Sequence, residues 1–482
     1  MGRVLGRGIG YLAQIMFARV LAPESFGLFA IGWTLLRLFS IAGHFGMDSG
    51  VIKFGGQYWQ KNALKLRSVV LVSLTSAFLS GAIMGMLLYV SAPWLAEVFF
   101  RKPALVPIFR GFAIIFPFAT ILRVAAATSS LSGKMLCGAI SEDIAQPILQ
   151  IGLFLVLFNM GMGLNAAILS IGVSYGISVI IGLVCVARSI PGIIGLGRIL
   201  SDDLVPILRF SFPAIVGVTL GAFNLWGDRL LVGYFSTEAS TGIYQSVSVL
   251  TMFTTIILSG FKISIAPAIA HLYYRGEHEA VKTLVRSVIR WALYISLPIL
   301  IFVFVNANGL IIGLFGLKYQ SGTVPLLILT IGQVFYVAFG IADQIFLMSG
   351  RQKEWVKISA SIFALTIVLD AILIPRTNLI GASVVSSVMM LLLGAVATMR
   401  LKHHLKFWLF DNYHAKIIVA SVITTLITHP IATNLPFGFA ANALVTILII
   451  CALFMTIVWA YGMETGDRAI IHQIIRKKTP RQ

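Results

Sequence analysis

The chain has 482 residues, of which 58% are hydrophobic and only 11% are charged, and its mean hydropathy is +0.95. A soluble domain carries about 25% charged residues, so this composition excludes an ordinary soluble protein. The net charge of +19 would suggest nucleic acid binding in a soluble chain. In an apolar chain, basic residues in cytoplasmic loops explain such a charge, and we expect no nucleic acid partner.

Apolar runs long enough to cross a bilayer core of roughly 30 Å recur along the whole chain. Backbone groups in lipid need hydrogen-bond partners within the protein, so each run is expected to be a helix. We therefore predict an all-α polytopic membrane protein with about 14 transmembrane helices. The predicted spans lie near residues 4–21, 26–50, 68–92, 104–130, 144–161, 164–187, 209–234, 242–266, 288–314, 322–349, 355–375, 379–399, 417–433 and 439–461.

Lysine and arginine residues are distributed unequally between the loops on the two predicted sides of the membrane. Most lie on one side, whereas the opposite loops carry Arg101, Lys102, Lys318 and Arg376. By the positive-inside rule, this predicts a protein of the inner (plasma) membrane with both termini in the cytoplasm. The basic loops 53–67 and 271–290 chiefly set this orientation, and they also suit contact with anionic membrane lipid.

Short motifs recur at an offset of about 215 residues, which indicates an internal repeat. The segment APESFGLF resembles STEASTGIY, and the match pairs Glu24 with Glu238 and Gly27 with Gly242. With an even number of helices in each repeat, we predict two parallel, pseudo-symmetric six-helix bundles, as in alternating-access transporters. The predicted parts are an N-terminal bundle at 1–190, a cytoplasmic linker at 191–208, a C-terminal bundle at 209–400, an interfacial linker at 401–416, and two additional helices with a basic cytoplasmic tail at 417–482.

Polar residues concentrate in the first two predicted helices of each half. In the second span, Trp33, Arg37, Ile41, His44 and Asp48 follow the helical period and share one face. Arg37 lies about 16 Å from the end of its span, where a charge is costly and marks a functional candidate. The predicted substrate-binding cavity is lined by Tyr11, Gln14, Arg37, His44, Asp48, Asn224, Asp228, Arg229 and Gln245.

Each of these positions also has a purely structural interpretation. Asp228 and Arg229 suit an ion pair, His44 suits helix packing, and Arg37 suits a buried pair with a carboxylate near Asp48 or with Asp343. We interpret Arg123, Asp343 and Lys262 as gate residues or ion pairs. Arginine stays charged and binds phosphate through two donors, so mid-membrane arginines favour an anionic ligand.

The sequence gives no sign of a metal, a cofactor or catalysis. Cys137, Cys185 and Cys451 are scattered and lack metal-ligand spacing, so we predict no metal site and no cofactor. The loops are too short for a catalytic domain, and no phosphate-binding glycine motif occurs, so we expect no enzyme. His44 titrates in the range useful for protons, and coupling to H⁺ or Na⁺ is left open.

Four segments carry a family likeness: FARVLAPESFGLFAIG at 17–32, FGMDSGVIKFGGQY at 45–58, WGDRLLVGYFSTEASTGIYQ at 226–245 and LMSGRQKEWVKIS at 347–359. They resemble motifs of the polysaccharide transporter family. This family contains the O-antigen-type, lipid-linked oligosaccharide flippases of the multidrug/oligosaccharidyl-lipid/polysaccharide exporter superfamily. The likeness extends over essentially the whole chain.

The resemblance implies two six-helix bundles around a cationic cavity. Such proteins flip undecaprenyl-diphosphate-linked oligosaccharide repeat units from the cytoplasmic to the outer leaflet, and a polysaccharide polymerase is a further partner to consider. Carried onto this chain, the implied cavity residues are Arg37, Asp228 and Arg229. The alternatives within the same superfamily are a lipid II flippase and a cation-coupled multidrug antiporter.

Overall fold

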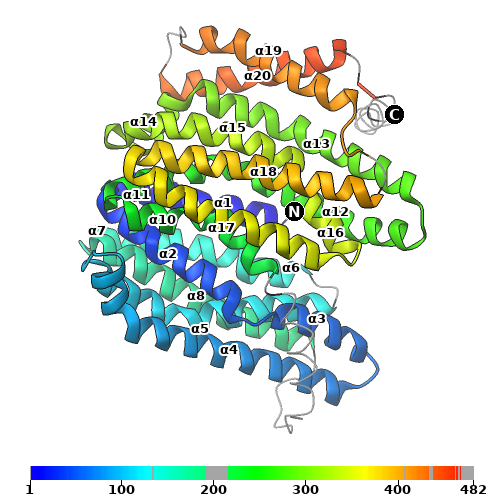
Figure 1. Cartoon of the computed structure of the whole chain (residues 1–482). Helices are drawn as coiled ribbons and strands as arrows, with labels where there is room; N and C mark the ends of the chain where they lie inside the picture. The colour runs from blue at the N-terminus through cyan, green and yellow to red at the C-terminus, as the bar shows by residue number, and fades with distance from the viewer. Residues whose placement is uncertain are drawn as a thin grey trace, which may run out of the picture. The chain divides into compact units, whose positions relative to one another are not determined.

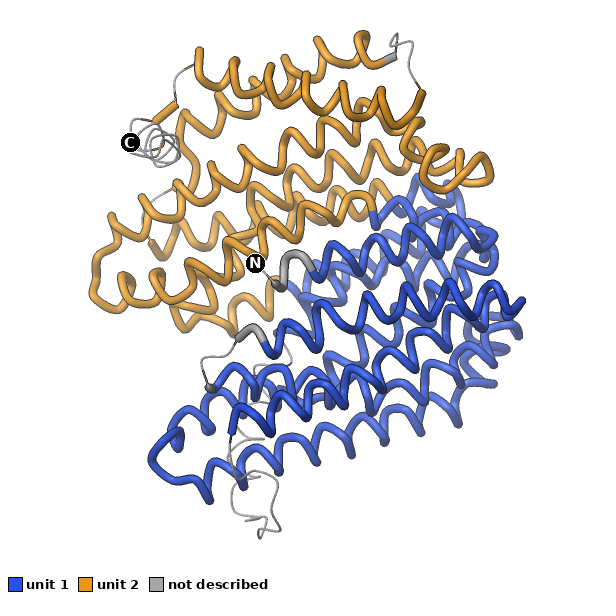
Figure 2. Tube along the Cα trace, turned by 180° about the vertical axis from the view of Figure 1, so that it is seen from behind, with its two compact units in different colours: residues 1–249, 359–382 blue, residues 250–358, 383–482 orange. Residues whose placement is uncertain are grey.

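The computed structural model describes residues 2–132, 135–190, 215, 217–405, 408–433, 438–461, 463–464 and 467. Every secondary-structure element in this described part is helical, which confirms the all-α prediction. The chain divides into two compact units, Met1–Val249 with Ser359–Ala382 and Leu250–Ile358 with Ser383–Gln482 (Figure 2). The predicted linker 191–208 and the basic tail from residue 468 lie outside the described residues.

The first unit contains the N-terminal helices, which run from blue to green in Figure 1, and most of α17 (Gln352–Thr377). Its helices begin at residues that suit a helix start: Pro23 opens α2, and the Asn62 side chain accepts a hydrogen bond from the Lys65 amide at the start of α4. The elements are α1 (Gly2–Val20), α2 (Pro23–Gly43), α3 (Met47–Tyr58), α4 (Ala63–Pro93), η1 (Trp94–Phe99), α5 (Leu105–Ser129), η2 (Ser130–Ser132), α6 (Met135–Gly138), η3 (Ala139–Ala145), α7 (Gln146–Asn159), α8 (Gly163–Ser189), α10 (Asp228–Phe235) and α11 (Glu238–Thr251).

The second unit is organised around α13 (His278–Val305), the most deeply buried of its spans. Residues of α13 form the centre of an apolar cluster with side chains from α12, α16, α19 and α20. The remaining elements are α12 (Phe253–Tyr274), α14 (Ala307–Phe315), η5 (Leu317–Gly322), α15 (Thr323–Phe339), α16 (Ala342–Met348), α18 (Leu379–Leu405), α19 (Asn412–Thr433) and α20 (Phe439–Tyr461).

Twelve helical segments among the described residues are long and apolar enough to cross a membrane. They correspond to twelve of the predicted spans, which confirms the polytopic membrane class. The predicted first span forms as α1, but it carries Arg3, Arg7 and Arg19 and is not one of the twelve. The predicted span 209–234 begins outside the described residues.

Several predicted spans are interrupted, among them 288–314 between α13 and α14 and 322–349 between α15 and α16. The span predicted at 26–50 breaks between α2 and α3, where Phe45 and Gly46 both adopt positive φ angles of 45° and 67°. The span predicted at 242–266 ends as α11 at Thr251 and resumes as α12 at Phe253. The prediction of continuous helices was wrong at all of these places, because apolar patterning alone does not reveal a local break of this kind.

One buried arginine adds an ionic attachment to the apolar packing of the two additional C-terminal helices, α19 and α20, in the second unit. Arg290 of α13 is 1% exposed, and its guanidinium contacts Asp467 at 2.8 Å, Asp411 at 3.2 Å and the carboxylate of Glu464. Trp291 adds a hydrogen bond from its indole nitrogen to Asp467 at 3.1 Å. The segments that flank α19 and α20 are thereby fastened to the centre of the unit.

The compact units do not follow the predicted halves. The first unit contains α10 and α11, which belong to the predicted bundle 209–400, and part of α17 from the same bundle. The bundle boundaries 1–190 and 209–400 therefore stay a prediction, as does the linker at 401–416, whose first residues continue α18 as far as Leu405.

Candidate functional site

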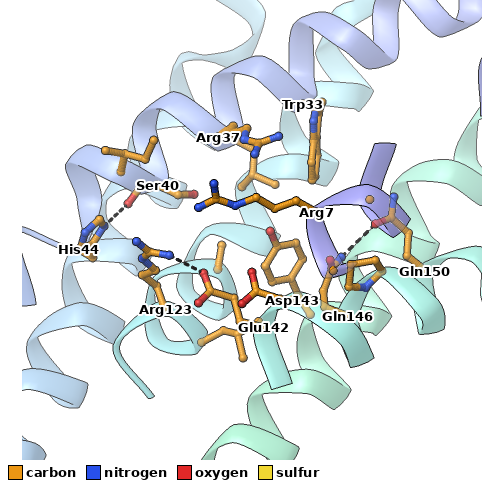
Figure 3. A pocket seen from close by; sticks show the side chains of 18 of the residues that line it. Arg7, Trp33, Arg37, Ser40, His44, Arg123, Glu142, Asp143, Gln146 and Gln150 are labelled. Atoms are coloured by element: carbon orange, nitrogen blue, oxygen red, sulfur yellow. Dashed lines mark hydrogen bonds and ion pairs between the residues drawn. The ribbon is translucent and has the colours of Figure 1, made fainter. Parts of the chain in front are cut away.

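A cavity of about 320 Å³ lies within the first unit. Its walls come from α1, α2, the start of α3, α5, η3, α7 and α8, together with Val218 and Trp226. Charged, amide and aromatic side chains line it, and Figure 3 shows several of them converging on one space. In a chain that is only 11% charged, such a concentration makes this cavity the candidate functional site.

The predicted polar face of the second span does line the cavity. Trp33, Arg37, Ile41, His44 and Asp48 all contribute, although the helix breaks between His44 and Asp48. The break is accommodated locally, since the Nδ1 atom of His44 lies 2.8 Å from the Ser40 carbonyl oxygen. The residues after the turn thus remain directed to the same space as those before it.

Arg37 is half-buried in this cavity, and its guanidinium lies over the Trp226 ring at 4.3 Å from the ring centroid. No carboxylate among the described residues forms an ion pair with it. Asp343, the predicted alternative partner of Arg37, accepts a hydrogen bond from Lys262 at 2.7 Å within the second unit. Arg37 is therefore a cation whose charge is balanced by no described acid.

The positive charge of Arg123, in contrast to that of Arg37, is balanced by nearby carboxylates. Its NH1 atom donates to Glu142 at 2.9 Å, and its Nε atom lies 3.5 Å from Asp48. The Nε2 atom of His44 lies 3.4 Å from the same carboxylate of Asp48. These four side chains form an ionic group that lines the cavity, and Figure 3 labels three of them, His44, Arg123 and Glu142.

The opposite end of the cavity is lined by amides. Gln146 donates from Nε2 to Gln150 Oε1 and to Ser174 Oγ, both at 3.1 Å. Gln14 of α1 accepts a hydrogen bond from Gln245 at 2.6 Å. Gln14 and Tyr11, both predicted from the sequence, line the cavity, whereas Gln245 stands behind Gln14.

The remaining predicted residues lie outside the cavity wall. Arg229 is 3% exposed and donates to Gln245 at 2.8 Å, to the Leu225 carbonyl at 2.9 Å and to Asp228 at 3.0 Å. Tyr244 donates to the second oxygen of Asp228 at 2.7 Å. Asn224 donates to the Leu220 and Ser359 carbonyls. These residues form a satisfied internal network, and a direct role for them in binding stays a prediction.

Sequence reasoning missed several cavity residues, namely Glu142, Asp143, Gln146, Gln150, Tyr175 and Trp226. Glu142 and Asp143 directly precede a predicted span in a chain with only 17 acidic residues, and this rarity was the available signal. Their segment η3 is π-helical, a geometry often found at functional sites. Glutamines within a span gave no comparable signal, because many buried amides only pack.

A family model described as "Polysaccharide biosynthesis protein" matches residues 16–323. The chain belongs to this family. A protein of Haloferax volcanii, named probable low-salt glycan biosynthesis flippase Agl15, is 22% identical over 455 residues, which cover 93% of this chain and 91% of the relative.

Solved structures show the same fold. The lipid II flippase MurJ in an inward closed conformation matches with a TM-score of 0.76 at 14% identity and covers 95% of this chain and 97% of its own. An inward-facing multidrug resistance transporter of the MATE family matches with a TM-score of 0.69 at 14% identity and covers 83% of this chain and 94% of its own. The polysaccharide transporter family predicted from the sequence motifs is thereby confirmed, and the solved structures confirm the fold.

Proposed function

We propose that the protein is a flippase that moves undecaprenyl-diphosphate-linked oligosaccharide repeat units across the cytoplasmic membrane. The observation that carries this proposal is Arg37, a cavity guanidinium with no ion-pair partner among the described residues. A diphosphate supplies the missing anion, because a guanidinium donates two parallel hydrogen bonds to phosphate oxygens. The family description and the name of the Haloferax relative support a substrate from glycan biosynthesis.

The mechanism that we propose is alternating access between the two predicted bundles. The diphosphate head enters the cavity while the polyprenyl tail stays in lipid. Trp226 holds the Arg37 guanidinium by a cation–π contact until the diphosphate arrives. Arg123 does not compete for the diphosphate, since Glu142 and Asp48 already engage it.

The cellular setting is part of the same proposal. The protein lies in the inner membrane with both termini in the cytoplasm, and its basic loops contact anionic lipid. A polysaccharide polymerase on the outer face uses the delivered repeat units. H⁺ or Na⁺ coupling is tested by measuring flipping with and without each gradient, in wild type and in His44→Gln. Equal wild-type rates under all conditions would remove coupling from the mechanism.

The test of function is a flipping assay in proteoliposomes that contain undecaprenyl-diphosphate-linked N-acetylglucosamine. A galactosyltransferase added outside with labelled UDP-galactose modifies only the sugars in the outer leaflet. Wild-type protein should make nearly all of the lipid accessible, whereas protein-free vesicles should stop at about half. Arg37→Ala should slow flipping at least tenfold, the scale expected for loss of a charge-assisted contact, and Arg286→Ala, a variant in the second unit, should not.

Parallel vesicles separate the alternatives. Vesicles with lipid II test the lipid II flippase, and vesicles loaded with ethidium test the multidrug antiporter. Transport of ethidium without flipping of either lipid would overturn the proposal. Flipping of lipid II alone would keep the flippase class and replace the substrate.

A further inference from the structure

Three glutamines occupy the amide end of the cavity and are almost completely buried. Gln14, Gln146 and Gln150 are 5%, 7% and 4% exposed. Ser174, which accepts a hydrogen bond from Gln146, is fully buried. Burying a carboxamide costs free energy unless its donors and acceptors are satisfied. The hydrogen bonds of these three side chains therefore show whether the cluster only packs or can also bind a ligand.

The hydrogen bonds within the described residues satisfy only part of each amide. Gln146 uses its amino group and keeps its carbonyl oxygen, and Gln150 uses its carbonyl oxygen and keeps its amino group. Gln14 accepts from Gln245 and likewise keeps its amino group. None of the three atoms left over is among the enclosed atoms that lack a partner, so each keeps some accessible surface, and all three side chains line the cavity. The cluster thus offers two amide nitrogens as donor groups and one carbonyl oxygen as an acceptor, all on side chains that are already held in place.

Two chain segments place the ionic and amide ends in the same order along the cavity. On η3 and α7, Glu142 comes first and Gln150 about 12 Å farther along the helix. On α2 the direction is reversed, with Trp33 before His44. Figure 3 agrees, since Gln146 and Gln150 lie across the cavity from His44 and Arg123, with Arg37 between the two groups.

We infer that the amide end, formed by Gln14, Gln146, Gln150 and Trp33, is a subsite for the sugar attached to the diphosphate. This inference rests on the proposed function and adds to it a determinant of glycan specificity. Hydroxyl and acetamido groups of a sugar both donate and accept hydrogen bonds, and they match the free amide atoms. The indole ring of Trp33 provides an apolar surface for the C–H face of a pyranose.

The spacing suits the first sugar of the repeat unit. Trp33 lies four residues before Arg37 on α2, which is about 6 Å along the helix axis. A pyranose bonded directly to the diphosphate extends over a similar length. A neutral, hydrogen-bonding subsite beside Arg37 therefore fits a head group in which a charged diphosphate is followed directly by an uncharged sugar.

The experiment measures binding to the full chain in nanodiscs by tryptophan fluorescence, for which Trp33 and Trp226 are reporters in the cavity. The probes are undecaprenyl diphosphate and the same lipid carrying N-acetylglucosamine, galactose, glucose or mannose. The variants are Gln146→Met and Gln150→Met, which keep side-chain size and remove the amide. The matched control is Gln333→Met, because Gln333 is 1% exposed in the second unit and does not line this cavity.

We expect wild type and Gln333→Met to bind at least one sugar-bearing lipid about tenfold more tightly than undecaprenyl diphosphate, the effect of one or two hydrogen bonds. Gln146→Met and Gln150→Met should lose this preference and keep wild-type affinity for undecaprenyl diphosphate. Wild type with no preference for any sugar, or a preference that survives in both variants, would overturn the subsite and leave the proposed function standing. Binding of none of the five lipids would instead overturn the proposed function. Equal unfolding temperatures of the three variants exclude misfolding as the cause.

Discussion

Gly27 of α2 and Gly242 of α11 meet at a crossing where the two backbones touch. A Cβ atom on Gly27 would collide with the Glu238 carbonyl, and one on Gly242 would collide with the Pro23 carbonyl. The sequence repeat pairs these same two glycines with each other. Equivalent residues of two parallel repeats meet where the repeat axis passes between them, so the crossing supports the predicted internal duplication.

We predict that Gly27→Ala and Gly242→Ala each lower the free energy of unfolding by about 1–3 kcal/mol, because the added methyl group must push backbone aside. Unfolding in detergent, followed by circular dichroism, measures the effect. Gly152→Ala is the matched control, since a Cβ there meets nothing within 4 Å, and its higher helix propensity should make it neutral or slightly stabilising. Equal stability of all three variants would show that the two helices do not need this close approach.

A second prediction concerns the ionic end of the cavity. The bond from Arg123 to Glu142 should give a coupling free energy of about 1 kcal/mol in a double-mutant cycle of Arg123→Met and Glu142→Gln. The value is modest because the Arg123 side chain is 46% exposed. Both single variants should still bind undecaprenyl diphosphate. A large loss of that binding in Arg123→Met alone would make Arg123, as well as Arg37, a contact of the anion.

Arg290 should be among the most sensitive positions of the second unit. Replacing it by Met leaves the carboxylates of Asp411, Glu464 and Asp467 together without their cation, so we expect a loss of roughly 3–5 kcal/mol. Arg286→Met provides the comparison, since Arg286 lies one turn earlier on α13 and donates to the Trp408 and Phe410 carbonyls in a more exposed setting. A similar small loss in both variants would mean that α19 and α20 are held by apolar packing alone.

The same cluster predicts a dependence of stability on acid. Burial by itself raises the pKa of Asp411, but the His414 ring and Arg290 outweigh it and hold that pKa below its usual value. A lowered pKa in the folded state gives stability that is present above about pH 4 and is lost as the pH falls further. Melting temperatures measured from pH 6 to pH 3 should therefore decrease more steeply for wild type than for Asp411→Asn. Parallel curves would assign the acid sensitivity to other groups.

Much of the architecture was predictable because apolar length and basic loops report directly on membrane helices. The periodic placement of Trp33, Arg37 and His44 likewise predicted a common polar face, and all three line the cavity. The break at Phe45 and Gly46 escaped the prediction because a short left-handed turn leaves the hydrophobic pattern unchanged.

The sequence alone could not show which residues far apart in the chain form ion pairs. Asp343 and Asp48 were both candidate partners of Arg37. In the structure, Asp343 forms an ion pair with Lys262, and Asp48 lies beside Arg123. Such choices depend on helix rotation and depth, which hydrophobic periodicity fixes only to within a turn. The amide end of the cavity was not predicted for a related reason. Gln146 is recognisable as part of a polar cluster only once its hydrogen bonds to Gln150 and Ser174 are known.

Asp370 of α17 is fully buried in the first unit, and neither carboxylate oxygen has a hydrogen-bond partner among the described residues. An acid in this position is costly whether it ionises and loses hydration or stays protonated with its polar atoms unsatisfied. We therefore predict that Asp370→Leu raises the free energy of unfolding by about 1–3 kcal/mol, because the variant no longer buries an unsatisfied polar group. Thr366→Val, one turn away, is the control: its hydroxyl donates to the Ile362 carbonyl at 2.9 Å, so removing it should give little or no gain. Thermal unfolding of both variants in detergent measures the difference, and destabilisation by Asp370→Leu would show that the carboxyl group contributes favourably to the folded state.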